Sequence, residues 1–329
     1  MALTDNLPFE QLVDYRPDVE EPADFDDFWR GTIDEARAAG GGWTLEEAET
    51  AISEFIVEDL TFAGFAGDPI RAWVTRPRRD GVPAADAALP VVVEYLGYNG
   101  GRGLPGERLQ WASAGYVHVL MDSRGQGSGW GSGGDTPDPH GSGPAVAGFM
   151  TRGIADPRTY YYRRLHTDAV RLLDAVREFP FADAGRIAVT GGSQGGALSI
   201  AVAALAPEVR AVMADVPFLA HFRRSIELTP AAPFTEVTQY LAIHRDQTEA
   251  VLRTLSYFDT VNFARRVTAP ALFSVALMDE VVLPSTVYAA YNHLPPGDRE
   301  LAVYPYNGHE AGQLHQWVRQ AAWLPSRLA

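Results

Sequence analysis

The stretch that decides the fold runs over residues 186–205 and reads RIAVTGGSQGGALSIAVAAL. Its first part alternates apolar and polar residues as a short strand does. Its last part carries apolar residues at helical spacing until Pro207. Between them, residues 191–195 read GGSQG, the G-x-S-x-G spacing of a nucleophile elbow. Small neighbours let such a strained turn lift its serine out of the sheet. We therefore predict a strand, a sharp turn and a helix, with Ser193 as nucleophile.

The composition is typical of a globular protein with one large core. The chain has 329 residues, of which 46% are hydrophobic and 21% are charged. Sheets of alternating strands and helices often run to this length within one domain when they carry insertions. We therefore predict a single domain over residues 1–329.

The charge argues against two kinds of partner. The formal charge is −15, and all 27 basic residues are arginine. Such a field repels nucleic acids and anionic lipid headgroups, so we expect neither a nucleic-acid nor a membrane partner. The missing lysine also excludes Schiff-base chemistry and a P-loop.

The chain contains no cysteine, which excludes disulfides, thiolate nucleophiles and cysteine-ligated zinc. We expect no metal and no cofactor. The N-terminus, MALTDNLPFEQLVDYRPDVEE, has neither the basic nor the apolar region of a signal peptide. The expected location is therefore the cytoplasm.

Strand and helix patterns alternate along the chain, which predicts an α/β fold with a doubly wound, mostly parallel sheet. An N-terminal extension over about residues 22–76 combines a helix (22–39) with an antiparallel hairpin (55–62 and 70–75). Residues 218–266 form a mostly helical insertion, longer than a crossover needs, that we interpret as a cap. The remaining strands are expected at 90–96, 116–121, 186–190, 209–214, 271–276 and 301–304, and the remaining helices at 160–179, 196–205 and 313–328.

A serine nucleophile needs a histidine that accepts its proton, and three histidines lie late enough in the chain to follow a candidate acid. His309 directly follows the last predicted strand, in a loop that can bring the imidazole over the elbow. His293 and His315 fall within helical patterns, so we interpret them as surface or packing residues. His309 is the predicted base.

The histidine needs a carboxylate, which in this arrangement lies between serine and histidine in the sequence. Asp279 follows the strand at 271–276, at the end where catalytic groups of open α/β sheets collect. Asp215 and Asp259 compete for the role. Asp215 also ends a strand, and it can equally be a cap or an ion-pair partner. Chain order favours Asp279.

Acyl transfer also needs backbone N–H groups that stabilise an oxyanion. The residue after the nucleophile, Gln194, is expected to supply one. The glycine-rich loop at residues 97–101, GYNGG, is expected to supply the other through the Tyr98 N–H, although a plain turn would read the same.

Three motifs in this order resemble carbohydrate esterase family seven, the acetyl xylan esterases and cephalosporin C deacetylases of the α/β-hydrolase superfamily. They are RGQ at 124–126, GGSQG at 191–195 and HE at 309–310. The similarity runs from the first helix nearly to the C-terminus and includes the stretches GYNGGRG (97–103), DSRGQGSGW (122–130), DPRTYYYRR (156–164), DVPFLAHFRR (215–224) and LSYFDTVNFA (255–264).

The resemblance implies a serine esterase that removes acetyl groups from small substrates such as acetylated xylo-oligosaccharides and cephalosporin C. It implies the same triad and oxyanion donors, and it gives Arg124 and Gln126 a supporting role beside the site. A structural arginine within a buried ion-pair network remains the alternative for Arg124. The resemblance also implies a ring-shaped homohexamer.

Two departures from the family pattern bear on the acyl pocket. Residues 279–284 read DEVVLP where a cysteine and paired prolines are usual, and Gly308 and Ala311 replace other residues near the histidine.

A general short-chain carboxylesterase, or a peptidase or lactonase of the same fold, is the alternative function. A binding protein without catalysis would normally lack one triad member.

Overall fold

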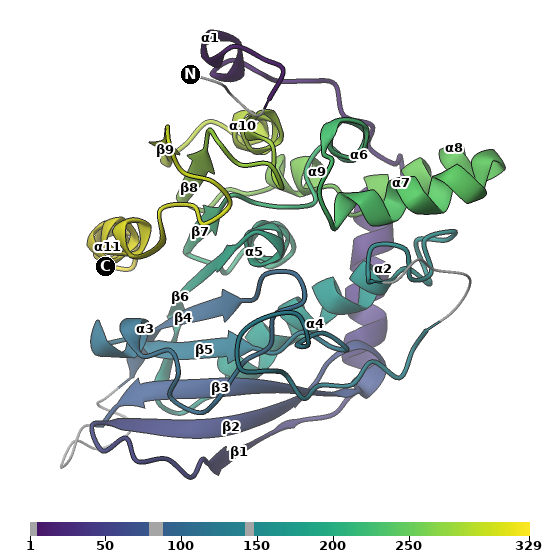
Figure 1. Cartoon of the computed structure of the whole chain (residues 1–329). Helices are drawn as coiled ribbons and strands as arrows, with labels where there is room; N and C mark the ends of the chain where they lie inside the picture. Colours follow the sequence, from purple (N-terminus) through teal and green to yellow (C-terminus); the bar gives the residue numbers. More distant parts are fainter. Residues whose placement is uncertain (1–4, 79–87, 142–147) are drawn as a thin grey trace.

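A mixed sheet forms the centre of the computed structural model, which describes residues 5–78, 88–141 and 148–329. Within these ranges the sheet has nine strands in the order β1-β2-β3-β5-β4-β6-β7-β8-β9 (Figure 1). They are β1 (Trp43–Glu47), β2 (Phe55–Ala63), β3 (Pro69–Pro77), β4 (Leu89–Tyr95), β5 (Val117–Met121), β6 (Ala182–Gly192), β7 (Ala211–Asp215), β8 (Ala271–Ala276) and β9 (Arg299–Tyr304).

The sheet changes character at β5. The strands β1, β2, β3 and β5 pair antiparallel, whereas β5, β4, β6, β7, β8 and β9 pair in parallel. The predicted mostly parallel sheet and the predicted hairpin of β2 and β3 are therefore confirmed. The strand β1 was not predicted: it is an edge strand with a half-exposed, charged sequence, WTLEE.

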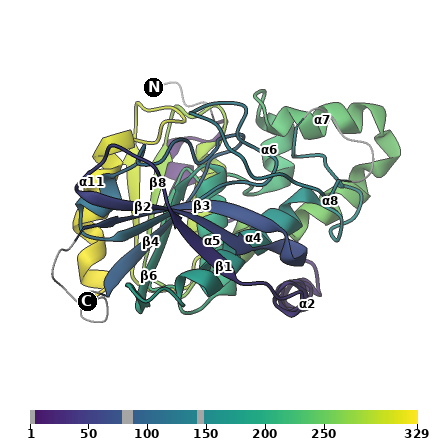
Figure 2. The ribbon, with the colours of Figure 1, turned by 90° about the horizontal axis from the view of Figure 1, so that it is seen from below.

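Helices cover both faces of the sheet. Figure 2 places α11 on one side and α4 and α5 on the other. The helices are α1 (Phe9–Leu12), α2 (Phe25–Ala38), α3 (Gln110–Ser113), α4 (Tyr161–Val176), α5 (Gln194–Leu205), α6 (Phe222–Leu228), α7 (Phe234–Ile243), α8 (Thr248–Ser256), α9 (Thr260–Ala264), α10 (Pro284–His293) and α11 (Gln313–Trp323).

The main core lies between the sheet and the layer that contains α5. This helix is apolar on all sides, and such a helix is stable only when it is fully surrounded. It packs against β4, β6 and β7 on one side and against α4 and α9 on the other. A smaller core on the opposite face joins Trp111, Trp323 and Leu324 to the sheet. The elbow therefore leads into a helix that is enclosed by the sheet on one side and by other helices on the other.

The predicted helical insertion at residues 218–266 contains α6, α7, α8 and α9. Of these, α9 packs against α5 and α10, whereas α6 contacts α7 and α8. Figure 2 shows α7 and α8 at the end of the molecule away from α11. The turn before α7 reaches the carboxyl ends of the parallel strands, where the candidate site lies.

Candidate active site

Ser193 occupies the turn between β6 and α5. Its backbone angles, φ 57° and ψ −118°, are strained for a residue with a side chain. Hydrogen bonds hold the turn in this shape. The Ser193 N–H donates to the Asp215 carbonyl at 2.8 Å, and the Ser193 carbonyl accepts the Phe218 N–H at 3.0 Å. The end of β7 and the loop that follows it thus fix the serine from both sides.

Two glycines of the motif are required by close packing. A Cβ on Gly191 would lie 2.5 Å from the carbonyl carbon of Gly195. A Cβ on Gly195 would lie 2.1 Å from the carbonyl oxygen of Tyr95 on β4. Both obstacles are backbone atoms, which cannot turn aside as a flexible side chain can. The G-x-S-x-G spacing therefore lets α5 begin directly against the sheet.

His309 lies in the loop between β9 and α11, and its two ring nitrogens face two different side chains. Nε2 is 3.1 Å from Ser193 Oγ, and Nδ1 is 2.9 Å from Asp279 Oδ2. A carboxylate can only accept a hydrogen bond, so the proton belongs on Nδ1. Nε2 then accepts the serine hydroxyl. The structure brings together the three residues that the sequence pointed to.

Asp279 follows β8 and is fully buried. Its Oδ1 accepts the backbone N–H groups of Val281 at 2.8 Å and Val282 at 2.9 Å. These two donors hold one carboxylate oxygen in place and direct the other toward His309. The segment that departs from the family pattern therefore still supplies the hydrogen bonds that orient the acid.

The two competing aspartates have other partners. Asp215 accepts the side-chain amides of Gln316 at 2.9 Å and Gln320 at 2.8 Å. Asp259 caps the N-terminus of α9 by accepting the Val261 N–H at 2.9 Å. Burial raises the pKa of each carboxyl to about 6. Both contact sets are structural.

The two competing histidines lie on helices. His293 is buried at the end of α10, where Nδ1 lies 2.7 Å from the Ala289 carbonyl oxygen, and burial lowers its pKa. His315 is an exposed residue of α11. Neither residue lines the pocket that contains Ser193.

The two predicted oxyanion donors lie on either side of Ser193. Gln194 is the first residue of α5, and the first N–H groups of a helix have no carbonyl partner within it. Tyr98 follows β4 and lines the pocket beside Ser193 and His309. Both segments thus lie near the nucleophile, and the donor role of their N–H groups stays a prediction.

The pocket has a volume of about 670 Å³. A second cavity of about 560 Å³ shares part of its lining, including Glu94, Arg108 and Trp130. Trp130 is 47% exposed, although its ring N–H donates to the Tyr98 carbonyl at 2.8 Å. At the junction, burial would raise the pKa of Glu94, but the hydrogen bond from His118 and the charge of Arg108 lower it to about 2.

Comparison with known proteins gives the family. The model of the family described as Acetyl xylan esterase (AXE1) matches residues 1–327. The chain belongs to the acetyl xylan esterase family. Acetyl esterase Axe7A of Xylanibacter ruminicola is 27% identical over 324 residues, which are 95% of this chain and 69% of that protein.

Two solved structures support the same assignment. The acetyl xylan esterase of Paenibacillus sp. R4 is 38% identical, with a TM-score of 0.88 over 95% of this chain and 98% of its own. Acetyl xylan esterase 1 of Thermoanaerobacterium sp. JW/SL YS485 is 32% identical, with a TM-score of 0.88 over 99% of this chain and 100% of its own. The chain is thus a carboxylic ester hydrolase of the α/β-hydrolase fold.

Gln126, from the RGQ motif of this esterase, lies beside the elbow. Its Oε1 accepts the Asn99 N–H at 2.6 Å, and its Nε2 donates to Gln194 Oε1 at 2.9 Å. Nε2 also donates to the Tyr161 hydroxyl at 3.0 Å. Gln126 thereby bridges the loop that contains Tyr98 and the helix that begins at Gln194.

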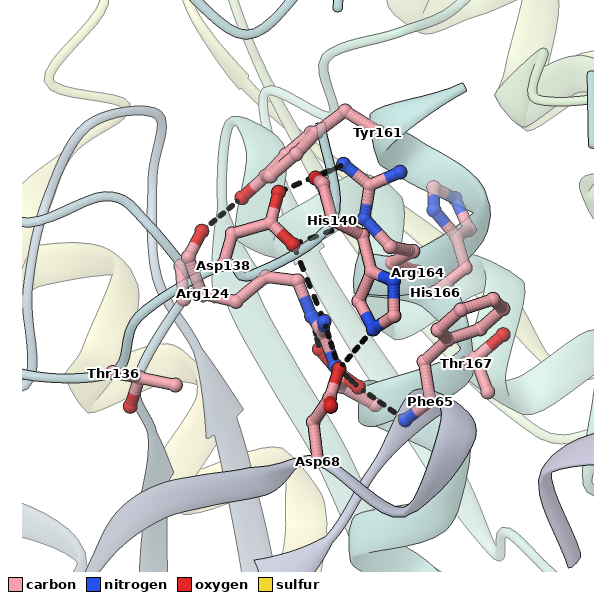
Figure 3. A network of polar contacts seen from close by, with 12 residues as sticks. Phe65, Asp68, Arg124, Thr136, Asp138, His140, Tyr161, Arg164, His166 and Thr167 are labelled. Atoms are coloured by element: carbon pink, nitrogen blue, oxygen red, sulfur yellow. Dashed lines mark hydrogen bonds and ion pairs between the residues drawn. The ribbon is translucent and has the colours of Figure 1, made fainter. Parts of the chain in front are cut away.

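Arg124, from the same motif, is fully buried in an ion-pair network (Figure 3). It donates to both oxygens of Asp168, at 2.6 and 2.8 Å, and to Asp68 at 2.9 Å. Asp138 joins Arg124 to Arg164. Burial would lower the pKa of Arg124, but the carboxylates outweigh it and raise the pKa. The side chain points into this network.

Glu236 and Trp130 are among the pocket residues that were not predicted. Glu236 of α7 lines the pocket and accepts a hydrogen bond from Tyr98. Trp130 lines both cavities, and its position in the stretch DSRGQGSGW was the available signal. Nothing in the sequence around Glu236 distinguishes it from an ordinary surface residue of a helix.

Across 5–78, 88–141 and 148–329, no group of three or more His, Asp or Glu residues could hold a metal ion. In the same ranges no helix has the length and apolar sequence needed to cross a bilayer.

Proposed function

We propose that this esterase removes acetyl groups from small acetylated alcohols, with Ser193 as nucleophile, His309 as base and Asp279 as orienting acid. One observation carries the proposal. Ser193, His309 and Asp279 are linked by contacts of 3.1 and 2.9 Å at the wall of a pocket. This is the arrangement that nucleophilic acyl transfer needs.

The reaction runs through an acyl-enzyme. His309 Nε2 takes the hydroxyl proton while Ser193 Oγ attacks the acetyl carbon. The N–H groups of Tyr98 and Gln194 stabilise the negative charge that forms on the carbonyl oxygen. His309 then gives the proton to the departing alcohol. A water molecule repeats the sequence on the acetyl-serine and releases acetate.

The alcohol is proposed to lie along the junction of the two cavities. Trp130 offers an exposed aromatic surface there, and Arg108 and Glu94 offer polar groups. Sugars combine apolar C–H faces with hydroxyl groups, so they suit a lining of this kind. Acetylated xylo-oligosaccharides are the proposed substrates, which agrees with the acetyl xylan esterase family and with the similarity to the acetyl xylan esterase of Paenibacillus sp. R4. Cephalosporin C-like acetyl esters are proposed as well.

The acyl group is proposed to be short. Ala232, Pro233 and Glu236, from the predicted cap at residues 218–266, contribute to the pocket wall. We treat this segment as a cap over the elbow, within one domain spanning residues 1–329. Each methylene beyond acetyl would then press against the wall. A homohexamer in the cytoplasm completes the proposal and rests on the family resemblance and the sequence alone.

A panel of esters tests the function. The panel comprises p-nitrophenyl acetate, butyrate and octanoate, acetylated xylo-oligosaccharides, cephalosporin C and an aminoacyl anilide. We expect kcat/KM to fall at least about tenfold from acetate to butyrate, since a misfitted methylene is worth roughly 1 to 3 kcal/mol. A flat acyl-length profile would identify a general carboxylesterase, and turnover of the anilide would identify a peptidase.

A further inference from the structure

The hydroxyl of Tyr98 has a hydrogen-bond arrangement that the proposed mechanism does not use. It accepts the Phe149 N–H at 2.7 Å and lies 2.6 Å from Glu236 Oε1. Because the Phe149 N–H already occupies the acceptor side, the Tyr98 proton is directed to Glu236. The other carboxylate oxygen of Glu236, Oε2, accepts the Met150 N–H at 3.0 Å.

These bonds close a ring among three segments that are distant in the sequence. They are the loop after β4, the stretch at residues 148–150, and α7 of the predicted cap. Gly148 packs closely against the carboxylate of Glu236, because a Cβ at Gly148 would lie 2.1 Å from Glu236 Oε1. Glu236 itself is only 9% exposed. Its carboxylate is therefore held in one place instead of sampling the solvent.

The backbone around Tyr98 is fixed at two further points. The Tyr98 carbonyl accepts the ring N–H of Trp130 at 2.8 Å, and the next N–H, of Asn99, donates to Gln126 at 2.6 Å. Glu236 holds the side chain. Hydrogen bonds therefore hold the Tyr98 hydroxyl, the Tyr98 carbonyl and the following peptide group. We infer that the Tyr98 N–H keeps a fixed direction at the pocket wall.

We propose that Glu236 is a positioning residue for the oxyanion site: through the Tyr98 hydroxyl it holds the loop whose N–H stabilises the developing charge. The inference rests on the proposed function, since it assigns Tyr98 the same donor role. It also makes α7 part of the catalytic apparatus, because movement of this helix shifts the oxyanion loop with it.

The contacts specify why a carboxylate stands at this position. Two donors, the Tyr98 hydroxyl and the Met150 N–H, point at two different oxygens of Glu236. An amide offers one acceptor only, so Glu236→Gln leaves one of these donors facing an NH₂ group. Burial also raises the pKa of Glu236, although the hydrogen bonds from Tyr98 and Met150 oppose that shift.

The test compares Glu236→Gln, Tyr98→Phe and the double variant, with Glu249→Gln as a matched control on the exposed side of α8. Tyr98→Phe keeps the backbone N–H and removes only the hydroxyl. We expect kcat on p-nitrophenyl acetate to fall by about tenfold to a hundredfold in both single variants, because a misplaced oxyanion donor acts on the transition state. KM should change less than about threefold, the pattern of an interaction made in the transition state.

The double variant separates positioning from general damage. If Glu236 acts through Tyr98, the double variant should be about as slow as either single variant, because residues in contact are non-additive. The control should keep the parent kcat. Single variants within twofold of the parent, or multiplicative losses in the double variant, would overturn the proposal.

If Glu236→Gln does not fold, Tyr98→Phe alone tests the proposal. The expected result is the same: kcat falls while KM changes less than about threefold. Ser193→Ala separates the two hypotheses: if the parent hydrolyses acetyl esters and Ser193→Ala does not, the proposed function holds whatever the Glu236 result is.

Discussion

Asp279→Asn is the most informative perturbation of the proposed triad, because the structure determines which way the new amide faces. Two backbone N–H groups, of Val281 and Val282, point at Oδ1. Asparagine keeps its carbonyl oxygen there and turns its NH₂ toward His309 Nδ1. That nitrogen must then accept, so the ring proton moves to Nε2. The serine hydroxyl loses its acceptor, and the nucleophile is no longer activated.

The residual rate follows from the opposite amide orientation. Only a flipped amide keeps the productive tautomer of His309, and it sets NH₂ against both backbone donors. Each unsatisfied buried donor costs about 1–3 kcal/mol, so the flip costs about 2–6 kcal/mol. At about 1.4 kcal/mol per factor of ten, the productive fraction is about 4 × 10⁻² to 5 × 10⁻⁵. We therefore expect kcat to fall by a factor in that range.

The assay is steady-state hydrolysis of p-nitrophenyl acetate, with thermal unfolding as the check on folding. Asp215→Asn is the matched control, because its partners are the side-chain amides of Gln316 and Gln320, and the Gln320 amide can rotate so that its oxygen accepts the new NH₂ group. We expect the control to stay within about threefold of the parent, as a substitution outside the reacting groups should. An Asp279→Asn variant that kept a tenth of the parent kcat, or a crippled Asp215→Asn, would refute the assignment of the acid.

Three other outcomes are expected. Ser193→Ala and His309→Ala should each lower kcat by about four orders of magnitude with the fold intact, and an organophosphate should label the parent but not Ser193→Ala. Asp215→Asn should change the pH dependence of stability, because burial raises the folded pKa of Asp215 to about 6. The parent should lose stability relative to the variant as pH rises from about 4 to about 6, and chemical unfolding curves recorded at several pH values should show no further pH-dependent change in this difference below pH 4. Light scattering should give the mass of a hexamer, and a monomer at every accessible concentration would contradict that expectation.

The elbow could be predicted from the sequence because its requirements are local. The close approaches at Gly191 and Gly195 involve atoms within the turn or on the adjacent strand, so glycine is needed at fixed offsets from the serine. The strand and helix on either side follow from apolar periodicity. Strand ends were less certain: β6 extends over Ala182–Gly192, beyond the predicted 186–190. Pairing with neighbours, which the sequence does not reveal, decides where a strand stops.

His309 and Asp279 could be predicted because the topology of a parallel sheet limits where residues that follow its strands can lie. In a parallel sheet the carboxyl ends of all strands meet at one edge, so residues that follow different strands come close together. Each of these residues follows a strand in the sequence. Proximity was therefore predictable, whereas the distances of 3.1 and 2.9 Å depend on loop conformations that only the structure gives.

The residues that hold the site in place were harder to predict, because their partners lie far away in the sequence. Glu236 contacts Tyr98 across 138 positions, and Gln126 contacts Gln194 across 68. Neither contact has a local pattern: a glutamate on a helix and a glutamine in a loop usually face water. Burial at these positions results from the packing of whole segments, which hydrophobic periodicity does not encode.

The two interpretations of Arg124 that the sequence left open are compatible in the structure. Its side chain is fixed in the buried ion-pair network, while its backbone carbonyl accepts the Tyr161 hydroxyl at 2.6 Å. The Tyr161 oxygen in turn accepts Nε2 of Gln126, which bonds to Gln194 and Asn99. The network therefore fixes the backbone from which Gln126 reaches both proposed oxyanion segments. A structural arginine can support this site without touching it, since the rigidity of the network is what keeps the donors in position.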